Sequence, residues 1–276
     1  MKKFLSVLSI LMTILIMIYI YARFIEPELL TVRYETINTD YLKNDEIKIL
    51  QFSDTHISEY FDIDDLNNAI DKINEENPDI VVFTGDLIDQ FNNYENKENI
   101  HEIWEILGSI NAPIKYAVYG NHDYGGGAEK VYKEIMEKSG FKLLINEKEE
   151  LPQYNINFIG MDDSIFGEYE PAVISGNMDK DMYNIVLSHE PDVADRLLEY
   201  SIDLLLAGHS HGGQVNLPFA NYLPSLGEKY VRGFYDFENF RQTKVYVNIG
   251  LGTSTIPMRF MAAPELTVIT LKGNHN

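Results

Sequence analysis

The chain has 276 residues, of which 45% are hydrophobic and 24% are charged, and these fractions are typical of a folded globular protein. They exclude disordered, collagen-like and coiled-coil proteins. Acidic residues number 43 and basic residues 22, so the formal net charge is −21, which repels nucleic acid and anionic membrane surfaces. Cysteine is absent, which excludes disulfides, thiolate nucleophiles, iron–sulfur clusters and cysteine-based zinc sites.

The first 26 residues differ from the rest of the chain. Phe4 to Ala22 is an uncharged run of 19 residues, and a helix of that length is about 28 Å long, close to the thickness of a bilayer's hydrocarbon core. The alternative is a cleaved signal peptide, whose apolar region is usually shorter and ends in small residues, whereas this run ends YIYARF. We therefore expect an uncleaved membrane anchor. Lys2 and Lys3 before the run, against Arg23 after it, favour a cytoplasmic N-terminus and an extracytoplasmic domain.

Residues 27–46 are expected to be a linker, and residues 47–276 a single domain in which strands alternate with helices. Short apolar segments predict strands at 47–52, 80–83, 114–119, 154–160, 183–187, 204–207, 245–249 and 266–271. Apolar residues at helical spacing predict helices at 64–74, 98–107, 128–138 and 193–199. This alternation is typical of a mostly parallel sheet, or of two stacked sheets, covered by helices.

Residues of the types that bind metals follow five of these strands directly, and five of the seven histidines are among them. The segments are Ser53-Asp54-Thr55-His56, Thr84-Gly85-Asp86, Gly120-Asn121-His122-Asp123, Ser188-His189-Glu190 and Gly208-His209-Ser210-His211. In open α/β sheets, ligands bind at the carboxyl ends of the strands. We therefore expect these segments to converge on one crevice.

The spacing within the segments suits metal binding. Asp54 and His56 are two residues apart, as are His209 and His211, and in an extended chain both members of such a pair point to the same side. Each pair can therefore serve one metal site. Glycines that permit tight turns and close approach to an ion precede three of the segments, at Gly85, Gly120 and Gly208. Carboxylate, imidazole and amide ligands without sulfur suit Mn, Fe or Zn.

In order and spacing, these segments resemble the metallophosphoesterase (calcineurin-like phosphoesterase) family. A single Gly-Asp or His-x-His means little, but five segments in order from Asp54 to His211 make chance a poor explanation. Nearly the whole chain after Glu46 takes part in the resemblance. The segment from Gly250 to Glu265 resembles the membrane-associated bacterial branch of the family.

The resemblance implies an α/β fold, an αββα sandwich of two mixed sheets flanked by helices. It also implies two divalent metal ions, Mn, Fe or Zn, bridged by Asp86. One metal site would be completed by Asp54, His56 and His211. The other would be completed by Asn121, His189 and His209. His122 would act beside the metals, with Asp123 holding its ring.

The expected chemistry is hydrolysis of a phosphoester by a metal-bridging hydroxide, without a covalent phospho-enzyme. Two divalent ions bring more positive charge than Asp54, Asp86 and a hydroxide return, so the crevice attracts an anionic phosphate. Such a metal pair lowers the pKa of its water and binds both the attacking and the leaving oxygen. His122 is placed to protonate the leaving oxygen, and Asp123 would fix its tautomer.

We expect a phosphodiester substrate, because membrane-linked relatives suggest it and no basic cluster is evident for a doubly charged phosphate. The alternatives are a phosphomonoesterase and a membrane-anchored metal-binding protein of the same fold without turnover. His122 counts against the second alternative, since a protein without turnover needs no proton donor. A P-loop and a G-x-S-x-G motif are absent from the sequence, which argues against P-loop NTPases and α/β serine hydrolases.

Two further features each allow two interpretations. Arg259 either holds the substrate phosphate through its planar guanidinium or pairs with an acidic side chain, and we favour the phosphate. The segment from Gln214 to Lys244 is either a loop packed by its own aromatic residues or an apolar lip beside the metals that accepts the lipid part of a substrate. Its large apolar residues are Phe219, Tyr222, Leu223, Tyr230, Phe234, Tyr235, Phe237 and Phe240.

Overall fold

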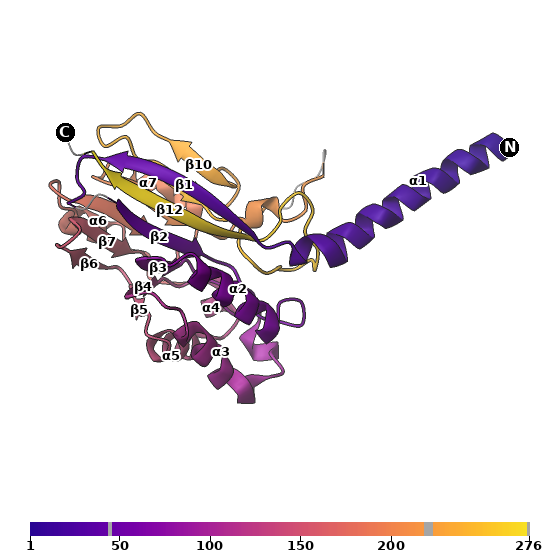
Figure 1. Ribbon diagram of the computed structural model, residues 1–276, viewed down its shortest axis with the longest axis horizontal. Coiled ribbons are helices and arrows are strands. Elements are labelled where there is room, and N and C mark those ends of the chain that lie inside the picture. Colours follow the sequence, from indigo (N-terminus) through magenta and orange to yellow (C-terminus); the bar gives the residue numbers. More distant parts are fainter. Residues whose placement is uncertain (44–45, 218–222, 275–276) are drawn as a thin grey trace.

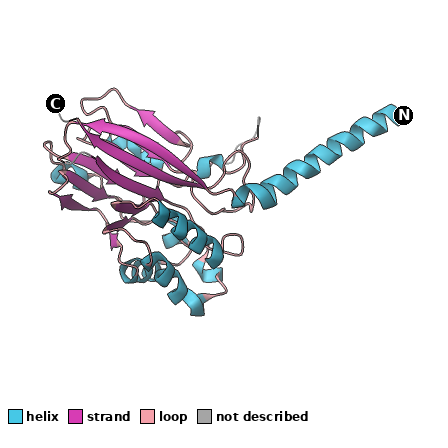
Figure 2. Ribbon diagram, viewed as in Figure 1, coloured by secondary structure: helices cyan, strands magenta, loops and turns pink. Residues whose placement is uncertain are grey.

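Two six-stranded sheets pack face to face, and helices cover their outer faces (Figures 1 and 2). The structure, a computed structural model, describes residues 1–43, 46–217 and 223–274. The first sheet, in the order β1–β12–β2–β3–β4–β5, contains β1 (Thr31–Thr39), β2 (Glu46–Phe52), β3 (Ile80–Phe83), β4 (Ile114–Ala117), β5 (Lys142–Leu143) and β12 (Glu265–Gly273). The second, in the order β10–β11–β9–β8–β7–β6, contains β6 (Glu147–Leu151), β7 (Ile156–Gly160), β8 (Tyr183–Leu187), β9 (Leu204–Ala207), β10 (Gly233–Asp236) and β11 (Lys244–Val247).

Both sheets are mixed. In the first sheet, β12 runs antiparallel to β2, and the other neighbouring strands are parallel. In the second, the edge strands β6 and β10 run antiparallel to their neighbours, and the strands between them are parallel. The expected αββα sandwich is therefore confirmed.

Strand β3 shows why the central strands are continuously apolar. Ile80 and Val82 belong to the core between the two sheets, whereas Val81 and Phe83 belong to the core between the first sheet and its helices. Successive side chains of a strand point to opposite faces, so a strand buried on both faces needs an apolar residue at every position. Each such side chain contributes about 1.5–3 kcal/mol when fully buried.

The helices on the outer faces are α2 (Ile63–Glu75), α3 (Ile100–Gly108), α4 (Asn121–Gly125), α5 (Glu129–Lys138), α6 (Ala172–Asn177) and α7 (Ala194–Leu197). A capping box starts α2, in which Asp62 accepts from the backbone N–H of Asp65 and Asp65 accepts from that of Asp62. The buried face of α2 consists of Leu66, Ala69, Ile70 and Ile73. This is the face that the helical spacing of its apolar residues predicts.

The prediction of a linker over residues 27–46 is wrong for most of that segment. Thr31–Thr39 forms β1, which pairs in parallel with β12 at nine positions, from Thr31 opposite Glu265 to Thr39 opposite Gly273. β1 is an edge strand, and most of its side chains are exposed or half-buried. A strand with so little buried surface does not need regular apolar residues, so the hydrophobic pattern did not reveal it.

The N-terminal helix α1 (Lys2–Ile20) projects away from the domain (Figure 1). A π-helical turn (Tyr21–Ile25) and a 3-10 turn (Glu26–Glu28) continue it. The whole stretch Lys2–Glu28 has a mean hydropathy of 2.4 over its most apolar window, and none of that window is buried. Among the described residues it is the one helix that is long and apolar enough to cross a membrane, a property that an N-terminal signal sequence shares.

Candidate dinuclear metal centre

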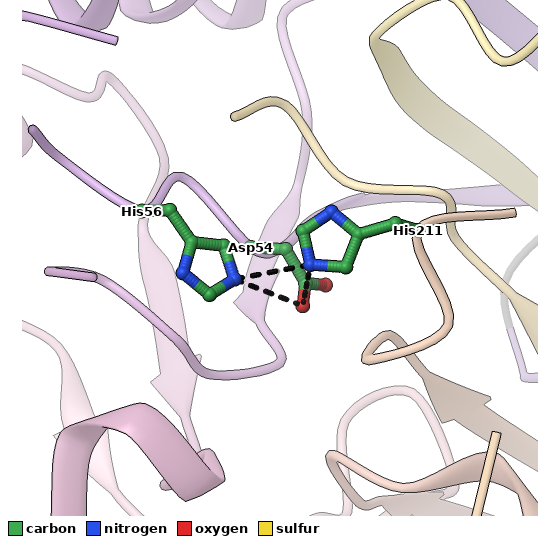
Figure 3. Close-up of side chains that lie close together, drawn as sticks. All are labelled: Asp54, His56 and His211. Atoms are coloured by element: carbon green, nitrogen blue, oxygen red, sulfur yellow. Dashed lines mark hydrogen bonds and ion pairs between the residues drawn. The ribbon is translucent and has the colours of Figure 1, made fainter. Parts of the chain in front are cut away.

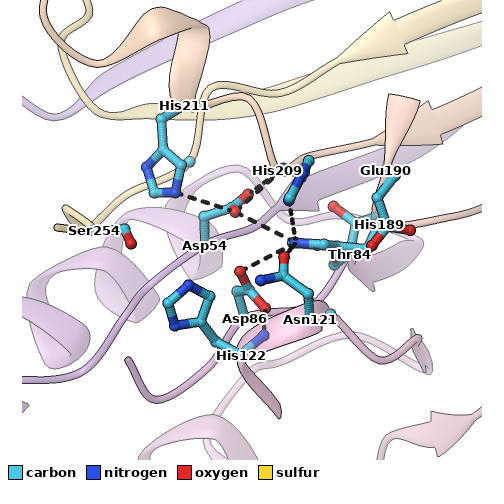
Figure 4. A network of polar contacts seen from close by, with 12 residues as sticks. Asp54, Thr84, Asp86, Asn121, His122, His189, Glu190, His209, His211 and Ser254 are labelled. Atoms are coloured by element: carbon cyan, nitrogen blue, oxygen red, sulfur yellow. Dashed lines mark hydrogen bonds and ion pairs between the residues drawn. The ribbon is translucent and has the colours of Figure 1, made fainter. Parts of the chain in front are cut away.

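Side chains from five strand ends meet at one edge of the sandwich (Figure 4). All of the metal ligands expected from the sequence are among them, and most are completely buried. They come from the segments that follow β2, β3, β4, β8 and β9. The residues are Asp54, His56, Asp86, Asn121, His189, His209 and His211.

The first group of ligand atoms belongs to Asp54, His56 and His211 (Figure 3). His211 Nε2 lies 3.0 Å from His56 Nε2 and 3.5 Å from Asp54 Oδ1. His56 Nε2 is 3.8 Å from the same carboxylate oxygen. Two imidazole nitrogens and one carboxylate oxygen thus point to a common centre, although His211 is 155 positions from His56 in the chain.

The second group belongs to Asp86, Asn121, His189 and His209. The expectation from spacing that His209 and His211 serve one metal site is therefore wrong, because His211 belongs to the first group. His189 Nε2 lies 3.1 Å from His209 Nδ1, 3.1 Å from Asp86 Oδ2 and 3.2 Å from Asn121 Oδ1. The other ring nitrogens are engaged elsewhere, because His189 Nδ1 donates to the carbonyl of Thr84 and His209 Nε2 donates to that of Ser225. The inward-facing nitrogens of both rings are therefore available to a cation.

Asp86 lies between the two groups. Its Oδ2 is 3.4 Å from His56 Nε2 of the first group and 3.1 Å from His189 Nε2 of the second. Its Oδ1 accepts the backbone N–H of His122 at 2.8 Å. One carboxylate oxygen therefore faces both sets of nitrogens, which is the position of a ligand shared by two cations.

The protonation states of these residues test whether cations fit the site. Burial lowers the pKa of His56, but hydrogen bonds to Asp54 and Asp89 and the charge of Asp86 outweigh it and raise the pKa to about 10. Burial also lowers the pKa of His189, but the charge of Asp86 raises it well above its ordinary value. Without metal, the buried carboxylates are thus balanced by protons on two imidazoles. Divalent cations would displace these protons and bring more positive charge to the buried carboxylates.

The pKa values of the other two candidate ligand histidines, His209 and His211, are lowered instead. Burial, together with the positive charge of His189, lowers the pKa of His209 to about 4. Burial likewise lowers the pKa of His211, with His56 adding to the effect. Each group therefore contains a neutral imidazole that faces a protonated one, and a divalent metal ion could bind the nitrogens of both once the proton is lost.

The backbone at these residues is strained. Asp54, His56, Asp86, His209 and His211 all have left-handed φ angles, of 50°, 42°, 62°, 68° and 50°. Residues other than glycine rarely adopt this region, and each instance costs about 1–3 kcal/mol. Such strain persists where the surrounding fold enforces it, and its concentration in five ligand candidates indicates a functional site.

Two glycines allow the strand ends to approach each other. Gly85 has a φ of 93°, and a Cβ there would lie 2.6 Å from the backbone nitrogen of Gly120. A Cβ on Gly120 would in turn collide with the carboxylate of Asp86. The close approach that these glycines permit is between the backbones that follow β3 and β4, and it places Asp86 beside Asn121.

Asp123 does not hold the ring of His122, so this expectation is wrong. Its carboxylate instead accepts three backbone N–H groups, from Asp86, Leu87 and Gly120, at 2.8–3.0 Å. Asp123 is the third residue of α4, and its side chain returns to the residue that caps the helix. Burial, with the nearby charge of Asp86, raises the pKa of Asp123 to about 7. These hydrogen bonds show that Asp123 stabilises the turn that carries Asp86.

Asp89 is the residue that contacts the ring of His122, and the sequence interpretation missed it. His122 Nδ1 donates to the backbone carbonyl of Asp89 at 2.6 Å and lies 3.2 Å from its carboxylate. The same carboxylate is 3.1 Å from His56 Nδ1. The sequence could have indicated Asp89 by its position, because it follows Asp86 by three residues in the segment after β3.

Arg259 does not reach the crevice, so the expected phosphate contact is wrong as well. The side chain is fully buried, and its guanidinium donates to the backbone carbonyls of Ile249, Gly252 and Ala262. Burial lowers its pKa to about 10. Arg259 therefore holds together the turn that runs from β11 to β12, which the sequence pattern did not reveal.

The seven candidate metal ligands, from Asp54 to His211, are called the metal-type cluster below. A cavity of about 280 Å³ opens beside it. Asp86, Asn121 and His122 line its polar side, and Ile165 and Phe166 are apolar members of its lining. Phe166 is 60% exposed. Ser254 and Thr255 also line it, and Thr255 is shared with a second cavity of about 530 Å³ that includes Asp89 and Tyr60.

The aromatic segment from Gln214 to Lys244 contributes little to this cavity. Tyr230 is buried and packs against Tyr235 and Phe237, as the loop interpretation proposes. Phe234 packs against Tyr246. Phe219 and Tyr222 lie outside the described residues. From the described part of the segment, the cavity lining includes Gln214, Pro224 and Ser225. The exposed apolar residues beside the metal-type cluster are Ile165 and Phe166, which the sequence interpretation did not select.

Comparison with known proteins agrees with this geometry. Residues 47–213 match the family described as calcineurin-like phosphoesterase. The chain is 38% identical to the uncharacterized metallophosphoesterase YkuE of Bacillus subtilis, over 93% of this chain and 91% of that protein. It is 28% identical to the phosphodiesterase YaeI of Escherichia coli, over 81% and 82%. It is 25% identical to the UDP-2,3-diacylglucosamine pyrophosphatase LpxG of Chlamydia muridarum, over 81% and 83%.

Fold, site and relatives define a metal-dependent hydrolase of phosphoric esters. The chain belongs to the calcineurin-like phosphoesterase family.

Proposed function

We propose that the protein hydrolyses a phosphodiester with two divalent metal ions, Mn, Fe or Zn. Asp54, His56 and His211 would hold one ion, and Asn121, His189 and His209 would hold the other. Asp86, which lies between the two groups, would contribute to both. The observation that carries this assignment is that Asp86 Oδ2 lies 3.4 Å and 3.1 Å from one histidine nitrogen of each group.

When bound, the ions supply an activated water as nucleophile and neutralise the negative charge of the phosphate. The protein supplies the proton for the leaving oxygen from His122, whose ring lines the cavity beside Asp86. Burial lowers the pKa of His122, but the charge of Asp86 and the hydrogen bond to Asp89 raise it above its ordinary value. The raised pKa favours the protonated imidazole, which is the form that acts as general acid.

A diester is favoured over a monoester by the lining of the cavity. No lysine or arginine occurs among its described lining residues, so a doubly charged terminal phosphate finds no cation there besides the metals. The relative YaeI is named a phosphodiesterase, which also supports a diester. Ile165 and Phe166 offer an apolar surface for one esterified group, and the relative LpxG is named for a diacylated sugar nucleotide. A lipid-linked diester fits both observations.

We also propose that residues 1–26 anchor the protein in the membrane, with the catalytic domain on the extracytoplasmic side. The support is the apolar length of α1 together with its attachment to the domain, because Glu26 at its end is buried and accepts the backbone N–H of Ala262. A signal peptide that is removed has no need of such contacts. The domain then begins at β1 rather than at residue 47.

The test is hydrolysis of bis(4-nitrophenyl) phosphate by the full-length protein with Mn²⁺, with EDTA as control and 4-nitrophenyl phosphate as the monoester. His122→Ala should lower kcat by about 10²–10⁴-fold, because a positioned general acid contributes that much. Metal content, measured by elemental analysis, should stay at the wild-type value. Hydrolysis that survives EDTA, or a variant that loses metal and turnover together, contradicts the proposal.

A further inference from the structure

We propose that the protein surface around the base of α1 is a second membrane contact, which seats the catalytic domain on the bilayer and directs its cavities toward lipid headgroups. We call it the juxtamembrane surface. It consists of Phe24, Ile25, Leu29 and Met261. The inference rests on the membrane anchor and the phosphodiesterase activity proposed above, and it names the substrate class as a phosphodiester lipid that remains in the bilayer while its phosphate is cleaved.

The first observation is that the two helical turns that continue α1, Tyr21–Ile25 and Glu26–Glu28, are attached to the domain. The backbone N–H of Arg259 donates to the carbonyl of Ala22 at 2.9 Å, and that of Ala262 donates to Glu26 Oε1 at 2.6 Å. The ring of Tyr21 packs edge-on against Phe260. The turn that contains Arg259 and Met261 therefore lies beside the point where α1 would leave the bilayer (Figure 1).

The second observation is the kind of side chain exposed there. Met261 is 65% exposed, Phe24 58%, Ile25 45% and Leu29 44%, although each is large and apolar. Exposed apolar groups next to a membrane-spanning helix lie at the height of the bilayer interface, where burying them in lipid is favourable.

The charged groups at this surface are mixed. The guanidinium of Arg23 lies over the rings of Phe24 and Tyr60, and Arg232 donates to the backbone carbonyl of Met261. Glu28 is exposed beside Leu29. The chain as a whole carries a charge of −21, so charge alone would not hold the domain on an anionic membrane. Apolar contact is therefore the interaction that would hold the domain on the bilayer, and it acts equally on a zwitterionic bilayer.

The third observation connects this surface to the metal-type cluster. The turn stabilised by Arg259 also carries Ser254 and Thr255, which line the cavity beside His122. Thr255 is shared with the second cavity, whose far side includes Tyr60, the residue under Arg23. With about 530 Å³, this cavity has the size of a small-molecule site. A lipid with its phosphate at the metals can therefore place its polar headgroup in the second cavity and its acyl chains at the juxtamembrane surface.

Fluorescence quenching by brominated lipid tests the contact directly. Trp104 is replaced by Phe in the full-length protein, Met261→Trp is added, and the protein is placed in phosphatidylcholine nanodiscs with lipids brominated near the headgroup. The control carries Phe240→Trp instead, because Phe240 is 72% exposed and its neighbour Arg241 bonds to Tyr41, beyond the far end of β1. We expect about twofold quenching at position 261, which lies within the 5–10 Å depth of an interfacial contact, and none at position 240.

Equal or absent quenching at the two positions overturns the proposal whatever the activity of the protein. The functional consequence is measured with hexadecyl 4-nitrophenyl phosphate in the same nanodiscs, beside the soluble bis(4-nitrophenyl) phosphate. Met261→Asp should lower turnover of the embedded diester about tenfold, since one charge in place of one apolar contact costs about 1.4 kcal/mol or more, and leave the soluble diester unchanged.

Phe240→Asp is the matched control and should change neither rate. If wild-type protein cleaves the soluble diester but not the embedded one, or if Met261→Asp affects both equally, the inference fails while the phosphodiesterase proposal stands. If wild-type protein cleaves neither, the phosphodiesterase proposal fails, and with it the substrate class named here. The quenching experiment still decides whether the surface contacts lipid.

Discussion

Replacing Asp89 by Asn should lower turnover by disturbing the orientation and pKa of His122, while the protein still binds metal. The carboxylate of Asp89 lies 3.2 Å from His122 Nδ1 and 3.1 Å from His56 Nδ1, and it is partly exposed. Asn has nearly the same shape but no charge. The backbone carbonyl of Asp89 still accepts from His122, so the ring keeps one of its two contacts.

The magnitude follows from the lost charge. A full charge pair at this distance is worth about 5 kcal/mol at an effective dielectric constant of about 20, and solvent at the partly exposed carboxylate reduces this value. Replacing a carboxylate that orients a catalytic or ligand histidine costs about 10–100-fold in activity. We expect Asp89→Asn to lower kcat by this factor, which corresponds to about 1.4–2.7 kcal/mol.

The pH profile of kcat/KM shows whether the loss acts through His122. The carboxylate of Asp89 helps to raise the pKa of His122, and a general acid works below its pKa and stops working as pH rises through it. Removing the charge lowers that pKa, so the alkaline limb of the profile should move to lower pH. Because Asp89 also contacts His56, the assay is run at saturating Mn²⁺ and metal content is measured.

Asp123→Asn is the contrasting variant. Asp123 accepts backbone N–H groups and has no contact with the imidazole of His122. We expect it to reduce stability or metal content while the alkaline limb keeps its position. A profile that shifts in Asp123→Asn and stays in place in Asp89→Asn would refute the assignment of Asp89 as the residue that positions His122.

Two further predictions concern stability and metal binding. Arg259→Met leaves buried carbonyls without donors, so the free energy of unfolding in urea should fall by about 3–5 kcal/mol while the KM for bis(4-nitrophenyl) phosphate stays the same. A raised KM at unchanged stability would instead restore the phosphate-binding role. Metal binding should release protons, because the raised pKa values keep His56 and His189 protonated at neutral pH and only the neutral rings bind metal. Affinity should therefore rise with pH up to about 10, and calorimetry in buffers of different ionisation enthalpy counts the protons; no release at pH 7 would contradict the assignment.

The metal-type cluster was predictable because each of its residues lies within a few positions of the end of a short, mostly apolar strand. Parallel strands of one sheet end at the same edge, so Asp54 after β2 and Asp86 after β3 must lie close together. His189 and His209 follow neighbouring strands of the second sheet in the same way. Chain position alone was sufficient to predict that these residues lie together, since only a few residues separate each strand from its ligand.

The failures occurred where a side chain's direction depends on tertiary contacts. Asp123 is adjacent to His122 in sequence, but as the third residue of α4 it turns back to the N-terminus of its helix. Its distance of three residues from Gly120 is the spacing of a capping box and was a usable signal. Arg259 gave none, because the carbonyls that it satisfies belong to a turn whose shape depends on contacts with β1 and with the π-helical turn that follows α1.

The strand mistaken for a linker changes how the active site relates to the membrane. A flexible segment of 20 residues would have a root-mean-square end-to-end distance of about 25 Å, so the position of the domain relative to α1 would vary by about that distance. In the structure only Leu29 and Leu30 separate the last helical turn from β1, and the carbonyl of Pro264 accepts the backbone N–H of Thr31 at the start of that strand. The position of the metal-type cluster relative to α1 is therefore fixed by backbone hydrogen bonds. With α1 in the membrane as proposed, an enzyme held in this way reaches membrane-bound phosphates at one height above the bilayer, which is a physical reason for a substrate that is itself part of the membrane.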